Sequence, residues 1–146
     1  MDRISYATLQ YGCKMLSIDD VASLALALPE TTEGVRHGHR TWFVGSKGFA
    51  WERPFSKADL KRYGTERPPD GPIIAVSVAD LAEKEATLAE HAKGVFTIAH
   101  FEGFPAVLID LQFVTKKALH TLIIEAWLAC APTQLGDAYL ARRGRS

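Results

Sequence analysis

Residues 34–54 hold the side chains of this sequence that are best suited to chemistry or to ligand contact. His37 and His39 stand two positions apart, so in an extended chain both imidazoles point to the same side. Such a pair can take part in a transition-metal site when a third ligand, such as His100 or Glu102, joins it. No spacing in the sequence requires a third ligand, and two polar residues in a loop or at the entry to a strand are the favoured interpretation of the pair. We therefore treat metal binding as an alternative hypothesis and expect no resident metal or cofactor.

Two tryptophans, Trp42 and Trp51, belong to the same stretch and lie in the basic part of the chain. Residues 36–67 hold eight Lys or Arg and three Asp or Glu, whereas the whole chain has 17 of each kind and no net charge. Aromatic rings stack on nucleobases while cationic side chains contact phosphates. The pattern predicts DNA as a partner. The candidate nucleic-acid-binding residues are Arg36, Arg40, Trp42, Lys47, Trp51, Arg53, Lys57, Lys61 and Arg62.

The same aromatic residues have a purely structural interpretation. The runs 40–44 and 49–53 alternate in strand fashion around a short loop that contains Gly45 and Gly48, which is typical of a β-hairpin. Neighbouring positions of a strand face opposite sides, so one set of aromatic rings enters the core and the other lies on the open face. A cross-strand aromatic pair surrounded by solvated basic residues would stabilise such a hairpin without binding anything.

Catalytic motifs are missing from the sequence. It contains no G-x-S-x-G, phosphate-loop or dinucleotide fingerprint, and no pair of carboxylates stands out as acid and base. Cys13 and Cys130 match no metal or redox spacing, and the helical pattern around Cys130 favours a buried, unreactive thiol. We expect a protein that is not an enzyme.

Length and composition indicate one globular domain. The chain has 146 residues, 47% of them hydrophobic and 23% charged. No apolar run is long enough to span a membrane, and the first residues do not read as a secretory signal. We expect a cytoplasmic protein without membrane contact, which is a monomer or a weak homodimer.

Hydrophobic periodicity and capping residues predict the elements. A helix begins after Ser17 and stops at Pro29, and a second long helix begins after Thr115 and stops at Pro132. Further predicted elements are strands at 40–44, 49–53, 73–78, 95–100 and 105–113, a helical turn at 56–64, a helix at 80–94 and a short helix to about residue 140. The order α-β-β-β-α-β-β-α predicts a two-layer α+β fold in which helices cover one face of a five-stranded antiparallel sheet.

The predicted boundaries leave two short ends outside the domain. We interpret residues 1–16 as an N-terminal extension, with translation from Met15 as an open alternative, residues 17–141 as the domain and residues 142–146 as a basic tail.

Taken in order, four segments resemble the YjbR-like (MmcQ/YjbR) family. They are LALPETTEGVRHG, TWFVGSKGFA, VFTIAHFEGFPAVLIDL and the helix ending AWLACAP, followed by AY, so the resemblance runs from about Ser17 to Tyr139. It implies a two-layer α+β domain similar in topology to type III secretion chaperones. Members are commonly labelled DNA-binding, and no established activity comes with the motifs.

Few site residues follow from the resemblance. The positions that fit the family pattern look like turn and packing residues: Gly34, Gly38, Phe43, Val44, Gly48, Phe49, Ala50, Gly103, Pro105, Trp127 and Pro132. Family members often carry basic residues after the Ala-Pro near the C-terminus, where this sequence has Thr133 and Gln134. That departure weakens nucleic-acid contact at this end.

Two other functions stay open beside DNA binding. A protein-interaction or secretion-chaperone-like module, suggested by fold analogy alone, predicts a sizeable exposed apolar patch on the sheet or the last helix. A small-ligand or metal-binding protein would use His37 and His39.

Overall fold

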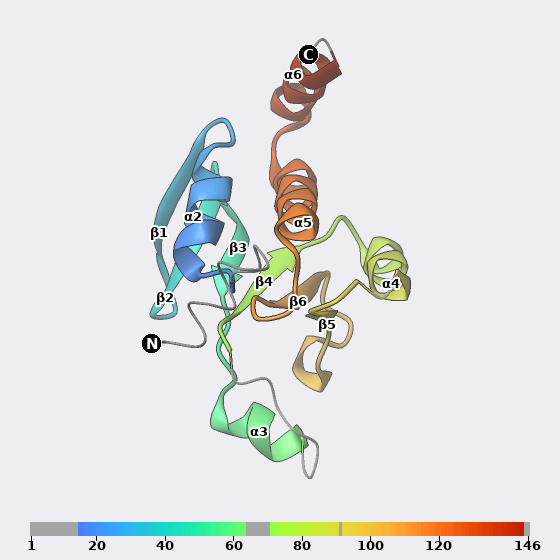
Figure 1. Cartoon of the computed structure of the whole chain (residues 1–146). Helices are drawn as coiled ribbons and strands as arrows, with labels where there is room; N and C mark the ends of the chain where they lie inside the picture. The colour runs from blue at the N-terminus through green and yellow to red at the C-terminus, as the bar shows by residue number, and fades with distance from the viewer. Residues whose placement is uncertain (1–14, 64–70, 91, 145–146) are drawn as a thin grey trace, which may run out of the picture.

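The computed structural model describes residues 15–63, 71–90 and 92–144, which form an α+β fold around one antiparallel sheet (Figure 1). The sheet has six strands in the order β1-β2-β3-β4-β6-β5. The strands are β1 (Thr31–Arg36), β2 (His39–Val44), β3 (Lys47–Glu52), β4 (Ile73–Ser77), β5 (Val95–Phe96) and β6 (Ala106–Asp110). The helices are α2 (Ile18–Leu26), α3 (Lys57–Tyr63), α4 (Leu81–Ala89), α5 (Lys116–Cys130) and α6 (Thr133–Gly144), with a 3₁₀ turn η1 (Ala99–Phe101). The predicted fold class is confirmed.

The strand that the sequence did not predict is β1, which makes the sheet six-stranded rather than five-stranded. Its sequence TTEGVR lacks the apolar alternation of a strand with a buried face. β1 forms because it pairs along its whole length with β2, from Thr31 opposite Val44 to Arg36 opposite His39. As the edge strand of the sheet it contributes little to the core and can be largely polar.

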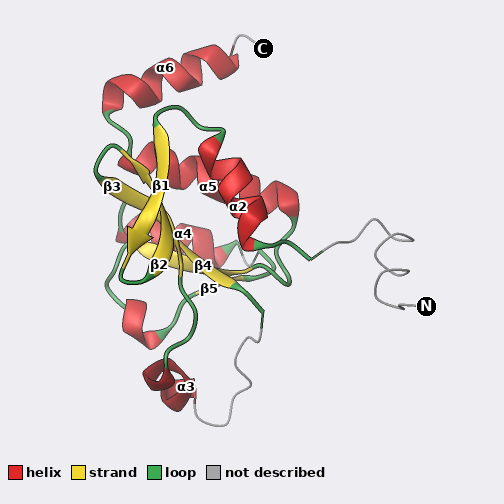
Figure 2. Ribbon diagram, turned by 90° about the vertical axis from the view of Figure 1, so that its left-hand side faces the viewer, coloured by secondary structure: helices red, strands yellow, loops and turns green. Residues whose placement is uncertain are grey.

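The two main helices cover one face of the sheet. α2 packs on β1 and β2, and α5 packs on β3 and β4 (Figure 2). Each begins at the predicted cap: Ser17 forms a capping box with Asp20, and the Thr115 side chain accepts from the Ala118 N–H. Between helices and sheet lies the main core, whose largest fully buried side chains include Trp42 and Trp127.

The opposite face of the sheet carries a second, smaller core. Its buried members come from the strands β4 and β6 and from η1: Ile73, Ala75, Phe101, Ala106 and Leu108. Trp51, Phe55, Phe96 and Ile98 pack against them and are only partly buried. This second face is therefore covered over β4 to β6 by short irregular segments, and that cover forms one side of the site described below.

Two predicted strands are shorter in the structure. The run 95–100 is a strand only over β5, because residues 99–101 turn into η1, where the Phe101 N–H donates to the Ile98 carbonyl at 2.9 Å. The run 105–113 ends at Asp110, where the Phe113 N–H donates back to the Asp110 carbonyl at 3.1 Å. In both cases a local turn takes the backbone hydrogen bonds that a longer strand would have used.

The ends of the chain differ from the predicted boundaries at one point. Helix α6 continues to Gly144, so Arg142 and Arg143 of the predicted basic tail are helical. Residues 1–14 of the predicted extension lie outside the described residues. In the described part of the chain, no helix is both long and apolar enough to cross a bilayer.

Candidate functional site

A pocket of about 800 Å³ opens on the sheet face opposite α2 and α5. Its floor consists of side chains from three neighbouring strands, Thr41, Trp51 and Ser77, together with the backbone of Gly48. Ligand sites in proteins commonly measure about 300–1,000 Å³ and combine aromatic walls with a few polar groups. The volume of this pocket falls within that range.

Aromatic side chains from two remote segments form the walls of the pocket. Phe55 comes from the loop after β3, and Phe101 and Phe104 come from η1 and the turn that follows it. The rings of Phe101 and Phe104 pack edge to face with centroids 5.6 Å apart. Trp51 on the floor is partly buried, so part of its ring surface remains available to a bound group.

A β-bulge places Trp51 on this face. The register between β2 and β3 shifts between Trp42 and Phe43, so that Trp42 pairs with Ala50 while Phe43 pairs with Gly48. Phe49 is the extra residue, and both it and Ala50 enter the main core. Simple alternation would have put Phe49 and Trp51 on the same face, and the bulge separates them.

The wall that carries Phe101 and Phe104 is held by a buried lysine on α4. Lys84 Nζ donates to the carbonyl oxygens of Phe101 at 2.5 Å and Phe104 at 2.8 Å. Burial lowers the pKa of Lys84 below its ordinary value, and the nearby carboxylate of Glu102 partly opposes that change. A buried ammonium that donates to two carbonyls fixes the position of this turn, so Lys84 supports the pocket from behind.

The mouth of the pocket carries basic and polar side chains, and the carboxylate of Glu52 also lines the pocket. Arg36, His37 and His39 line it from the β1–β2 hairpin, and His100 lines it from η1. His37 and Gly38 both have left-handed backbone angles, with φ of 54° and 80°, as a two-residue type I′ hairpin turn requires. The tight turn therefore holds the three residues of this hairpin beside the aromatic walls.

The structure corrects one member of the predicted nucleic-acid-binding set. Trp42 is 0% exposed in the main core, because its position in β2 faces α2 and α5. Its indole N–H donates to Glu33 Oε1 at 2.9 Å. The ring of Trp42 has no surface on which a base could stack.

Arg40, another member of the set, is engaged by acidic side chains. Its guanidinium donates to both carboxylate oxygens of Glu33, at 2.9 and 3.1 Å, and to Asp19 at 3.0 Å. The hydrogen bond from Arg40 is the main cause that lowers the pKa of the Glu33 carboxyl group. Two carboxylates therefore neutralise Arg40, which is a structural cation.

Arg53 lines the pocket but is also paired. Its Nη1 donates to Asp59 Oδ2 and to the Pro54 carbonyl, both at 2.8 Å, and its guanidinium lies 5.4 Å from the centroid of the Phe101 ring. Burial would raise the pKa of Asp59, but hydrogen bonds from Ser56 and Arg53 outweigh burial and lower it. Arg53 thus joins the loop after β3 to the opposite wall.

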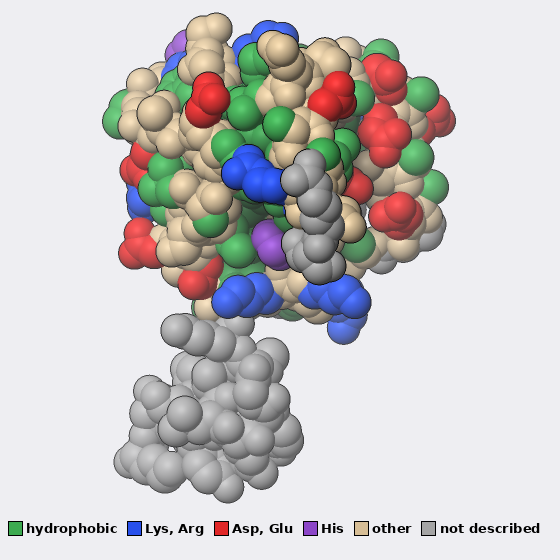
Figure 3. All heavy atoms as spheres, turned by 90° about the horizontal axis from the view of Figure 1, so that it is seen from above, with side chains coloured by type: hydrophobic (Ala, Val, Ile, Leu, Met, Phe, Trp, Pro, Cys, Tyr) green, Lys and Arg blue, Asp and Glu red, His purple; other side chains and the backbone are tan. Residues whose placement is uncertain are grey.

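The lysines of the set lie at two separate places. Lys47 begins β3, whereas Lys57 and Lys61 lie in α3, beyond the other end of that strand. All three are exposed. A six-residue strand spans roughly 20 Å. Arg62 is helical in α3. The predicted set is therefore not one continuous surface. On the face shown in Figure 3, acidic, basic and hydrophobic side chains are mixed.

The surroundings of His37 and His39 lack the close third ligand that a metal site needs among the described residues. His100, one of the two proposed third ligands, does line the same pocket as His37 and His39. Glu102, the other, lies in a neighbouring hollow beside Lys84. Across residues 15–63, 71–90 and 92–144, no three His, Cys, Asp or Glu side chains are close enough to hold a metal ion.

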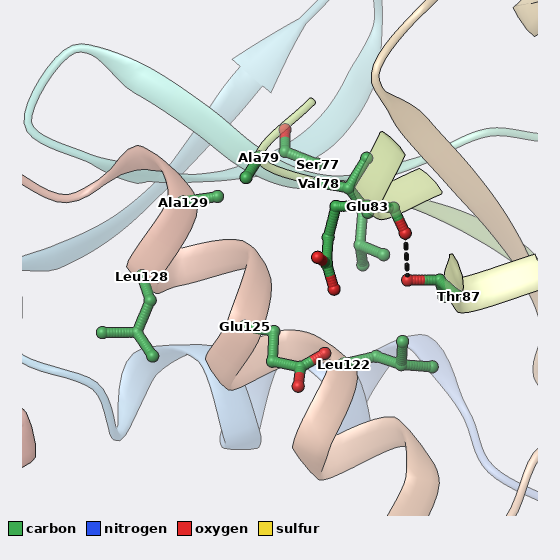
Figure 4. Close-up of a pocket in the computed structure, with 10 residues that line it drawn as sticks. Ser77, Val78, Ala79, Glu83, Thr87, Leu122, Glu125, Leu128 and Ala129 are labelled. Carbon is green, nitrogen blue, oxygen red and sulfur yellow. Dashed lines mark hydrogen bonds between the residues drawn. The ribbon is translucent and has the colours of Figure 1, made fainter. Parts of the chain in front are cut away.

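A second hollow of about 300 Å³ lies between α4 and α5 (Figure 4). Its apolar lining includes Leu122 and Leu128, and Glu83 and Glu125 enter it from the two helices. Glu125 is exposed as a whole residue, but partial desolvation of its carboxyl group beside this hollow raises its pKa. The charges of Glu83 and Glu90 add smaller contributions in the same direction. The like charges of Glu83 and Glu125 repel each other across this hollow.

The exposed large apolar side chains belong to several different elements of the chain. They are distributed over separate elements and turns: Met15, Leu26, Val35, Leu60, Leu81, Phe104, Phe113 and Leu140. A chaperone-like module should bury a contiguous apolar patch against its client. The spread of these residues gives that alternative no support in the described part of the chain.

Comparisons with known proteins place this chain in a family. The YjbR family model matches residues 26–129, so the chain belongs to the YjbR family. Uncharacterised proteins of Mycobacterium bovis and Mycobacterium tuberculosis are 45% identical over 133 residues, which is 89% of this chain and 100% of theirs. The crystal structure of a Deinococcus radiodurans protein with a DUF419 domain matches with a TM-score of 0.54 and 18% identity over 78% of each chain. That structure shows the same fold.

Sequence reasoning found Trp51, Arg36 and the histidine pair but not the walls of the pocket. Phe55, Phe101 and Phe104 carry no motif, and they meet Trp51 only because two segments fold back over the sheet. Lys84 gave no signal either, since it stands among charged residues of an apparently exposed helix. Hydrophobic periodicity along a helix identifies apolar residues that face the core. It cannot identify a lysine, such as Lys84, whose ammonium group is buried against backbone carbonyls.

Proposed function

We propose that this protein is a non-enzymatic binding domain whose sheet-face pocket takes a small organic molecule with a planar, largely apolar ring. The observation that carries the proposal is the partly buried Trp51 on the floor of a pocket with phenylalanine walls. Flat rings pack favourably on aromatic side chains, and the wall residue Phe104 is 48% exposed in the absence of a bound group. A ring inserted here would cover apolar surface on both residues.

The polar groups of the pocket support binding more than catalysis. The described part of the chain shows no hydrogen bond between any of its histidine side chains and a carboxylate or hydroxyl group that would orient the imidazole. A general base is normally oriented by such a partner and stands within hydrogen-bond reach of a nucleophile. The histidines of this pocket are better suited to polar contact with a ligand.

The three tryptophans provide a built-in test. Trp42 and Trp127 are 0% exposed and their indole N–H groups are bonded to Glu33 and to the Pro29 carbonyl, so only Trp51 can touch a ligand directly. In a proton–nitrogen correlation spectrum, naphthalene-2-carboxylate should shift the Trp51 indole signal saturably and leave the other two in place.

Two variants complete this experiment. Trp51→Leu lacks the reporting indole, so its binding is measured by isothermal titration calorimetry. This variant should weaken binding by about 10-fold or more, because stacking on an aromatic ring contributes about 1–3 kcal/mol. Phe113→Leu changes an exposed aromatic residue away from the pocket and should leave binding unchanged. If no indole signal moves at millimolar probe, the proposed function is wrong.

Nucleic-acid binding is the second candidate, and one observation favours it in a narrower form. Trp51 and Arg36 line a single pocket, and Arg36 has no carboxylate partner among the described residues, an arrangement that suits one unstacked base and its phosphate. Fluorescence anisotropy at low salt should then show tighter binding to a thymidine oligonucleotide than to a duplex, with affinity that falls as salt rises. Equal or undetectable binding to both would remove this candidate.

A further inference from the structure

Arg36 differs from the other arginines near the pocket. Arg40 and Arg53 are each held by carboxylates, whereas no Asp or Glu of the described residues lies within ion-pair distance of Arg36. Its side chain also makes no hydrogen bond to any described residue. An arginine has five N–H donors in a fixed planar arrangement, so these donors are available to a ligand.

The position of the Arg36 guanidinium is defined by packing. Its Cζ lies 4.8 Å from the centroid of the Phe43 ring, on the same face of the sheet as Trp51. Gly48 makes room for it, because a Cβ atom at that position would stand 3.3 Å from Arg36 Nη1 and 3.0 Å from Thr41 Cγ2. The guanidinium therefore extends from β1 across β2 toward β3 and lines the pocket.

A guanidinium packed on an aromatic face keeps its in-plane donors free. Such donors match the two oxygens of a carboxylate or phosphate, and the aromatic contact limits the side-chain freedom that is lost on binding. His37 and His39, on the same hairpin, add polar groups beside it. The open side of the pocket thus carries basic and polar groups beside apolar walls. It also includes one carboxylate, that of Glu52, whose Oε1 accepts a hydrogen bond of 2.8 Å from the Arg40 backbone N–H.

We propose that Arg36 binds the anionic end of the ligand, so that the pocket selects planar aromatic acids, either carboxylates or phosphate monoesters. This proposal rests on the proposed function of the same pocket. The ring lies against Trp51 and the phenylalanine walls, and the acid group meets the Arg36 guanidinium at the mouth. Charge complementarity and the Gly48 gap both favour this orientation.

Matched pairs of probes separate charge from ring packing. The affinity for naphthalene-2-carboxylate should be at least about 10-fold higher than that for naphthalene-2-carboxamide. A hydrogen bond to a charged group contributes more binding free energy than one between neutral groups. Naphthalen-2-yl phosphate against naphthalen-2-ol gives the same comparison for a phosphate. The preferred anion is the one whose acid shows the larger ratio of affinity to that of its neutral analogue.

Variants of Arg36 assign the effect to this residue. Arg36→Gln should reduce the affinity for the acid to that for the amide and leave the affinity for the amide unchanged, and Arg36→Lys should restore only part of the difference. The control is Arg143→Gln, because Arg143 also lies over an aromatic ring, Tyr139, but in α6 and outside the pocket. This control should behave as the wild type.

The outcomes distinguish the two proposals. If acid and amide bind equally well and Arg36→Gln changes neither, the pocket binds planar rings but the role of Arg36 is wrong. If neither probe shifts the Trp51 indole signal, the proposed function fails and the role of Arg36 fails with it. Arg36 is exposed, so unchanged urea midpoints should confirm that its variants are folded.

Discussion

Glu33 on β1 accepts a hydrogen bond of 2.9 Å from the indole N–H of Trp42 on β2, the residue directly opposite it in the register. The carboxylate lies at the edge of the main core and also binds Arg40 through both of its oxygens. It therefore connects a buried polar atom to the surface. This contact explains how a polar edge strand can stabilise the sheet.

The first prediction concerns this carboxylate. Glu33→Ala should lower the free energy of unfolding by about 1–3 kcal/mol at neutral pH, because the buried Trp42 N–H loses its acceptor. Glu33→Gln should lower it less, since the amide oxygen can still accept. Urea denaturation measures both, with Asp19→Asn as a control, because the Asp19 side chain is 88% exposed. An alanine variant as stable as the wild type would contradict this role.

The second prediction concerns Lys84 and the pocket wall. Lys84→Met should speed amide hydrogen exchange in residues 101–104 and weaken binding of naphthalene-2-carboxylate several-fold, because the two carbonyls it binds lose their donor. Global stability should fall by only about 1–2 kcal/mol, since the cost of burying the ammonium is removed as well. The exposed Lys93→Met is the control. Unchanged exchange in residues 101–104 would show that the wall stands without Lys84.

The third prediction compares two glycines with left-handed backbone angles. Gly94 has φ of 84°, and a Cβ there would come within 2.8 Å of both the Asp110 carbonyl oxygen and the Val114 nitrogen. Gly103 has φ of 76° and open space around it. Gly103→Ala should therefore cost about 1 kcal/mol from the backbone alone, and Gly94→Ala clearly more. Thermal unfolding measures the difference, and equal costs would contradict the close approach of β6.

The fourth prediction is a pH dependence at the contact of α4 and α5. The pKa of Glu125 is raised in the folded state, so the folded protein holds its proton to higher pH than the unfolded chain. Stability from this group is present below the unfolded pKa and is lost as pH rises through the folded pKa. Glu125→Gln should then stabilise the protein slightly at neutral pH, by about 0.5 kcal/mol, and have no stabilising effect in acid.

The control for this pH dependence is Glu85→Gln, an exposed change on α4. Its effect on the urea midpoint should be small at every pH. Two results would contradict the repulsion across this hollow (Figure 4). In one, Glu125→Gln changes the stability equally in acid and at neutral pH. In the other, it destabilises the protein at neutral pH.

The fold was largely predictable because its main helices carry their own signals. Ser17 and Thr115 are caps, and Pro29 and Pro132 follow the helix ends. β1 was not predictable, because a polar strand at the edge of a sheet shows no apolar alternation. It is stabilised by pairing with β2, and this pairing is a tertiary contact that the local sequence does not reveal.

The site was predictable only in part. Trp51 and Arg36 could be chosen from residue type, but alternation alone could not tell that Trp42 is buried while Trp51 is accessible. That distinction depends on which face the helices cover and on the bulge at Phe49. The charge count of residues 36–67 overestimated the basic surface because Arg40 is neutralised by Glu33 and Asp19, which lie outside that range. Arg53 is paired with Asp59 inside it.

The central claim is that the sheet-face pocket binds a planar aromatic acid between Trp51 and the phenylalanine walls, and a crystal structure with naphthalene-2-carboxylate tests it most directly. We predict that the naphthalene ring lies against Trp51 and Phe104, with its carboxylate within hydrogen-bond distance of the Arg36 guanidinium. An empty pocket at saturating probe, or a probe bound elsewhere on the molecule, would contradict the claim.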